Sequence, residues 1–138
     1  MSILEYFFPD QITSDEAIDY NCLAWAAGED KRRWEPDPMQ IYYWPPKAPR
    51  LWTLDAFIKA YETIGFVVCQ DGTPEVGFIK IALFVDVRTI PTHAARLLPT
   101  GRWTSKCGDL EDIEHDLTEV CGPPLNYGDI ACYMKKPA

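Results

Sequence analysis

The residues of this sequence that could carry out covalent chemistry are few: five cysteines and two histidines. A cysteine nucleophile reacts as the thiolate, and a nearby imidazole or a helix N-terminus is what lowers the pKa of a thiol enough to form it. Cys22 follows Asn21, and a helix that begins near Asn21 would place the thiol in its first turn. His93 opens an expected strand, from which an imidazole can face a helix terminus. We interpret Cys22 as a candidate nucleophile and His93 as its base.

Two short motifs resemble the papain-like amidases of the NlpC/P60 and CHAP type. Asn21-Cys22-x-x-Trp25 resembles their nucleophile helix, and His93-Ala94-Ala95 with the turn at Gly101 resembles their histidine strand and the hairpin after it. The resemblance implies a papain-like α+β fold and a third polar residue about a dozen positions past the histidine. That position is Ser105.

The same resemblance implies a thiol hydrolase or acyl-transfer enzyme, peptidase- or amidase-like, that acts on an amide, peptide or ester bond. Its catalytic residues would be Cys22, His93 and Ser105, and its substrate a peptide or protein. We expect no cofactor and no metal. The residues expected to bind substrate are Asn21, Trp25, Trp34 and Trp44.

Each candidate has a structural alternative. Cys22 and His93 could be core residues, since free cysteine is among the most buried residue types, and Ser105 could be a plain strand hydroxyl. His115 lies in an acidic stretch that favours the solvated face of a short helix from Leu110 to Leu117. Alternatively, Asp112 or His115 folds back and orients His93. A zinc site is not favoured, because the cysteines form no C-x-x-C pair.

A second hypothesis comes from a different functional class. If Ser105 does not support catalysis, the chain would be a catalytically silent papain-like module that binds a protein partner. Its net charge of −8 would then favour a basic one.

The composition limits the other possibilities. The 138 residues suit one domain, and a net charge of −8 argues against nucleic-acid binding, which neutralises phosphates with Lys and Arg. No run of about 18 apolar residues predicts a membrane span, and Met1 to Tyr6 do not have the pattern of a signal peptide. An odd number of scattered cysteines indicates reduced thiols, so we expect a cytoplasmic protein.

The pattern of elements predicts helices first and a mostly antiparallel sheet afterwards, an α+β arrangement in one domain, 1–138. The first helical region is either one helix over 15–27 or two, the second starting near Asn21. Residues 29–52 form a Pro-rich, aromatic insertion that either lines a site or covers the core. Thr53 caps a helix over 54–64. The expected strands are a 66–69 and 78–85 hairpin, a 92–98 and 102–106 hairpin, and a closing strand over 127–134.

Overall fold

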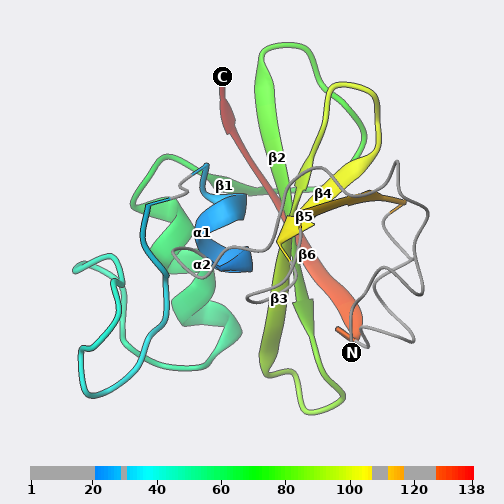
Figure 1. Cartoon of the computed structure of the whole chain (residues 1–138). Coiled ribbons are helices and arrows are strands. Elements are labelled where there is room, and N and C mark those ends of the chain that lie inside the picture. The colour runs from blue at the N-terminus through cyan, green and yellow to red at the C-terminus, as the bar shows by residue number, and fades with distance from the viewer. Residues whose placement is uncertain (1–20, 29–30, 107–111, 117–126) are drawn as a thin grey trace.

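A computed structural model describes residues 21–28, 31–106, 112–116 and 127–138. These residues form two helices and six strands (Figure 1). The helices are α1 (Cys22–Ala26) and α2 (Leu54–Glu62), and the strands are β1 (Val67–Cys69), β2 (Phe78–Val85), β3 (Pro91–Leu97), β4 (Trp103–Lys106), β5 (Asp112–His115) and β6 (Asp129–Pro137). The α+β class is therefore confirmed.

The six strands form one antiparallel sheet in the order β1-β6-β2-β3-β4-β5. The predicted β3–β4 hairpin is confirmed, because Arg96 pairs with Thr104 and Leu97 with Trp103. The predicted hairpin of β1 and β2 is wrong. The closing strand β6 lies between them and pairs with both. The turn motif at Asp71-Gly72 predicted a chain reversal between β1 and β2. It did not indicate that β6 would lie between these two strands.

Both helices begin at the residues that the capping pattern indicates. The Asn21 side chain accepts a hydrogen bond from the Ala24 N–H, and the Thr53 side chain accepts one from the Ala56 N–H, each over 3.1 Å. A cap of this kind satisfies one of the N–H groups that a helix leaves without a partner. The helix start near Asn21 is thus confirmed, whereas the residues before it lie outside the described part of the chain.

The main core lies between the two helices and one face of the sheet (Figure 1). Ile81, Leu83 and Ala94 contribute to this core with residues of α1 and α2. Because side chains alternate along a strand, Phe84 and His93 point to the opposite face, where their rings lie 5.5 Å apart. The sheet thus separates the helix-covered core from a second buried cluster.

The aromatic insertion belongs to the core. Trp34 and Trp44 are only 3% and 2% exposed. Trp34 stacks on Tyr61 of α2 at 5.8 Å, and Trp44 packs on Phe57 at 5.1 Å between ring centroids. Of the two alternatives for this segment, covering the core is the one that the structure shows. The expected substrate contacts of Trp34 and Trp44 are corrected accordingly, because neither side chain reaches the surface.

The predicted helix from Leu110 to Leu117 is also wrong where the chain is described. Asp112 to His115 form strand β5, which pairs with β4 so that Trp103 lies opposite His115. The His115 side chain is fully buried rather than on a solvated helix face. Glu114 lies on the other face of the strand, where it accepts a hydrogen bond from Arg102.

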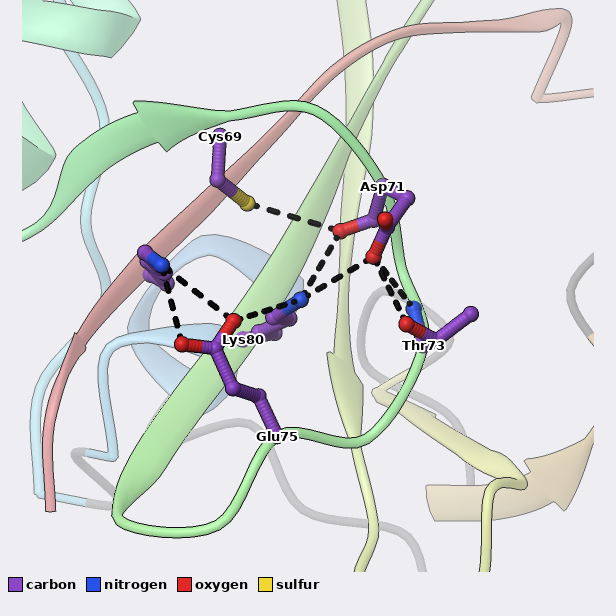
Figure 2. Close-up of polar contacts among 6 residues, drawn as sticks. Cys69, Asp71, Thr73, Glu75 and Lys80 are labelled. Carbon is purple, nitrogen blue, oxygen red and sulfur yellow. Dashed lines mark hydrogen bonds and ion pairs between the residues drawn. The ribbon is translucent and has the colours of Figure 1, made fainter.

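The connection between β1 and β2 is held by ion pairs (Figure 2). The buried Lys80 ammonium lies 3.1 Å from Asp71 and 3.3 Å from Glu75, and Lys135 also contacts Glu75 at 3.0 Å. Two carboxylates thus compensate the burial of Lys80. Within the described residues, neither helix has the length and apolar character needed to cross a bilayer.

Candidate functional site: a thiol beside a buried histidine relay

The first turn of α1 is fixed by the Asn21 side chain. Its Oδ1 accepts hydrogen bonds from the N–H groups of Ala24 and Trp34, and its Nδ2 donates to the Trp34 carbonyl over 2.7 Å. Asn21 is 6% exposed. With both ends of its amide engaged, Asn21 positions Cys22 and the aromatic insertion. The structure therefore gives it a positioning role in place of the expected contact with substrate.

Cys22 is the first residue of α1 and is half-buried. Loss of hydration on burial raises the pKa of its thiol to about 11, although hydrogen bonds from backbone groups of Ala94 and Leu23 act in the opposite direction. The effect of the Ala94 backbone on this pKa indicates that the sulfur lies near β3, close to the residue after His93. In the resting structure Cys22 is therefore a neutral thiol at neutral pH.

His93 is held inside the second buried cluster. Its ring stacks on Tyr127 with centroids 3.8 Å apart and planes at 2°, and it is 1% exposed. The Thr92 hydroxyl donates a hydrogen bond to the Tyr127 carbonyl, which fixes the stacked residue. Burial, and secondarily the nearby His115, hold the pKa of His93 well below its usual range. His93 is thus a neutral imidazole at neutral pH.

A chain of hydrogen bonds runs from His93 through two neighbouring strands. His93 Nε2 lies 2.8 Å from Ser105 Oγ on β4, and the same oxygen lies 2.6 Å from His115 Nε2 on β5. His115 Nδ1 in turn lies 2.7 Å from the backbone carbonyl of Asp116. We call His93, Ser105 and His115 the histidine relay.

The direction of the relay follows from its last member. A carbonyl oxygen only accepts, so His115 Nδ1 carries a hydrogen and, in the neutral ring, His115 Nε2 does not. With His115 neutral, the Ser105 hydroxyl donates to His115 Nε2 and accepts from His93 Nε2–H. In this arrangement the proton of neutral His93 is on Nε2, which leaves Nδ1 with a free lone pair.

His93 Nδ1 is buried and has no hydrogen-bond partner. A buried polar atom without a hydrogen-bond partner destabilises the fold, and such atoms concentrate at functional sites. The Cys22 sulfur lies near Ala94, the residue after His93. β4 pairs with β3 only at Arg96 and Leu97, so it does not cover the part of β3 around Ala94. The structure thus joins His93 to Ser105, whereas Cys22 packs against the helix-covered core near the backbone of Ala94 and makes no hydrogen bond to His93 Nδ1.

Tyr127 and His115 complete this cluster. The sequence did not indicate Tyr127, whereas a His115 that orients His93 was one of the alternatives for that residue, and the structure links the two rings through Ser105. Gly128 allows Tyr127 to reach His93: its φ is +91°, and a Cβ there would lie 2.1 Å from the Val85 carbonyl oxygen. For His115, the available signal was the alternation of Ile113, Glu114 and His115, which fits a strand with one buried face.

Two further expectations concern Trp25 and metals. The Trp25 indole N–H donates to Thr104 Oγ1 over 3.2 Å, and Trp25 also lines a cavity, so it alone of the expected tryptophans adjoins open space. No group of three metal-ligating side chains occurs in the described residues. Cys107 and Cys121 lie outside those residues.

An α+β domain with one antiparallel sheet, a half-buried thiol at the start of α1 and a buried histidine relay is the class that fold and site define. The model of the domain of unknown function DUF7689 matches residues 11–135, so the chain belongs to that family. Comparisons with curated proteins and with solved structures gave no match.

Proposed function

We propose that this protein is a papain-like thiol hydrolase or acyl-transfer enzyme that acts on an amide, peptide or ester bond, with Cys22 as nucleophile and His93 as base. The observation that carries the proposal is the free, buried lone pair of His93 Nδ1, whose availability follows from the relay. In this tautomer His93 can accept a proton, and Ala94, the next residue, lies near the Cys22 sulfur. These are features of a thiol–imidazole pair.

The proposed reaction starts from two neutral groups. As the Cys22 sulfur attacks the carbonyl carbon, its proton passes to His93 Nδ1. The imidazolium keeps its Nε2–H bond to Ser105, and the Nδ1 proton then goes to the leaving amine or alkoxide, which leaves a thioester on Cys22. Water or another acceptor, deprotonated by the same Nδ1, attacks the thioester and releases the thiol.

Burial shapes this mechanism. With the pKa of Cys22 at about 11 and that of His93 well below its usual range, the pair rests as thiol and imidazole rather than as an ion pair. Proton transfer would then accompany attack, as in hydroxyl nucleophiles activated by a general base. Peptides or proteins are the proposed substrates. The free thiols of Cys22, Cys69 and Cys132 suit the reducing cytoplasm that we propose as its location.

Two observations favour the alternative, a catalytically silent papain-like module that binds a protein partner through its acidic surface. The raised pKa of Cys22 and the lack of a hydrogen bond from Cys22 to His93 Nδ1 are also what a buried structural cysteine would show.

The two functions predict opposite orders of thiol reactivity, which iodoacetamide labelling near neutral pH measures. For a structural cysteine, a pKa of about 11 instead of the ordinary 9.0 lowers the thiolate fraction roughly 100-fold. The half-buried Cys69 and Cys132 should then label first. An enzyme should instead label Cys22 first.

The His93→Gln variant tests whether the reactivity of Cys22 depends on His93. In the enzyme it should lower Cys22 labelling by at least about tenfold and leave Cys69 and Cys132 unchanged. Circular dichroism would verify that the variant remains folded. Faster labelling of Cys69 and Cys132 in the natural chain, or Cys22 labelling that does not depend on His93, would leave the binding module as the better account.

A further inference from the structure

A cavity of about 650 Å³ lies beside the last turn of α1, where β2, β3 and β4 meet the loops at that end of the sheet. Its volume is within the range of small-molecule sites. Among the described residues its wall is mostly apolar, with side chains that include Trp25, Phe78, Ile79, Leu97 and Leu98.

Arg96 is the side chain that decides which molecule would suit this cavity. It lines the wall and is half-buried, and its Nη1 lies 3.7 Å from where a Cβ on Gly28 would be, close to the end of α1. No carboxylate of the described residues pairs with Arg96. Lys80, the buried ammonium nearby, pairs with two. A guanidinium beside apolar walls matches a planar carboxylate, which it can hold with two parallel hydrogen bonds.

The other charged side chains at the cavity are already compensated. Lys80 lies within 3.3 Å of both Asp71 and Glu75, and Glu75 also contacts Lys135 (Figure 2). Thr104 is occupied by the Trp25 indole. Of the described charged side chains that line the cavity, Arg96 is therefore the one without a charged partner.

We propose that this cavity binds a small carboxylate with an apolar body, the carboxylate on the Arg96 guanidinium and the apolar body against Trp25 and Leu97. The apolar wall supplies affinity through burial, and Arg96 selects the charged ligand over its neutral analogue. The proposal does not depend on the chemistry of Cys22.

Octanoate tests this proposal, with octanamide as the neutral molecule of equal length. Titration of the full chain is followed by NMR through the Trp25 indole N–H, which lies in the cavity wall. Octanoate should shift this signal saturably, and octanamide should bind at least about tenfold more weakly. Arg96→Gln should lower octanoate affinity by at least about tenfold and leave octanamide unchanged.

Arg88→Gln is the matched control, since Arg88 is an exposed arginine between β2 and β3 and outside the cavity wall; it should change neither affinity. Cys22→Ala should bind octanoate as the natural chain does, whether or not Cys22 is a nucleophile. The proposal is overturned if octanamide binds as tightly as octanoate, if Arg96→Gln has no effect, or if millimolar octanoate shifts nothing.

Discussion

At the scale of single residues, the chemistry depends on which nitrogen of His93 carries the proton. If the hydrogen bonds of the relay ran in the opposite direction, the proton of His93 would move from Nε2 to Nδ1. It would then occupy the lone pair that is proposed to accept the Cys22 proton. The Asp116 carbonyl prevents this, because it can only accept and therefore orients His115, Ser105 and His93 in turn. His115 would thus act as a positioning residue through Ser105.

Substitution of His115 tests that role. In His115→Gln the side-chain carbonyl can still accept from Ser105, whereas His115→Leu removes the acceptor. On the proposed function, we expect His115→Leu to lower Cys22 labelling by iodoacetamide by at least about tenfold at neutral pH and His115→Gln to retain most of it. A packing role alone would give the opposite ranking, since leucine fills an apolar site better. Thermal unfolding of both variants provides the control.

At the scale of elements, three strands and one glycine assemble the relay. His93, Ser105 and His115 come from β3, β4 and β5, and antiparallel pairing places their side chains on one face of the sheet. Tyr127 covers that group just before β6 begins. Its approach depends on Gly128, whose backbone lies against the carbonyl of Val85.

Gly128→Ala should therefore both destabilise the fold and displace Tyr127 from His93. We expect a loss of roughly 3 kcal/mol or more in the free energy of unfolding, because a backbone must move to admit the methyl group. Gly77→Ala is the matched control. Its φ of +83° is similar, but nothing lies within 4 Å of the added Cβ, so only conformational strain of about 1 kcal/mol should appear. Equal losses in urea denaturation would contradict this account.

The cap of α2 gives a second test at this scale. Thr53→Ala removes the acceptor for the Ala56 N–H and should cost about 1 kcal/mol of unfolding free energy. Thr53→Ser keeps that oxygen and should cost little. If the two variants denature alike in urea, the methyl group and not the cap is what stabilises α2.

At the scale of the whole molecule, acid stability should depend on the ion pairs at Lys80. Hydrogen bonds from Thr73 and Lys80 lower the pKa of Asp71 from 3.8 to about 2. A carboxyl whose pKa is depressed on folding stabilises the protein above its unfolded pKa and loses that contribution as the pH falls through the folded value. Asp71 therefore contributes above about pH 4, and its contribution disappears between about pH 4 and pH 2.

Asp71→Asn should accordingly lower stability at neutral pH and flatten its decline below about pH 4, as measured by urea denaturation across pH. Asp55→Asn is the control, because Asp55 is also an exposed acid paired with a lysine, Lys59, at 2.9 Å. Parallel pH profiles for Asp71→Asn and the natural chain would show that the Lys80 cluster does not govern acid stability.

The sequence by itself determined what depends on neighbouring residues. The cap at Thr53, the β3–β4 hairpin at Gly101 and the order of Cys22, His93 and Ser105 could be read directly, because capping, turn geometry and strand alternation act over a few positions. The cap at Asn21 was one of two alternatives, and the structure decided between them. The hydrogen bond between His93 and Ser105 agrees with the spacing that the family resemblance supplied.

Only the tertiary structure decided the rest. Pairing of β6 with β1 joins residues 64 to 68 positions apart, such as Val67 and Lys135, and no local pattern encodes such a partner. Burial of His115 follows from the pairing of β5 with β4, and burial of Trp34 from its stacking on α2. The neutral state of Cys22 has the same origin, since the pKa of a thiol depends on what surrounds it in space rather than in sequence.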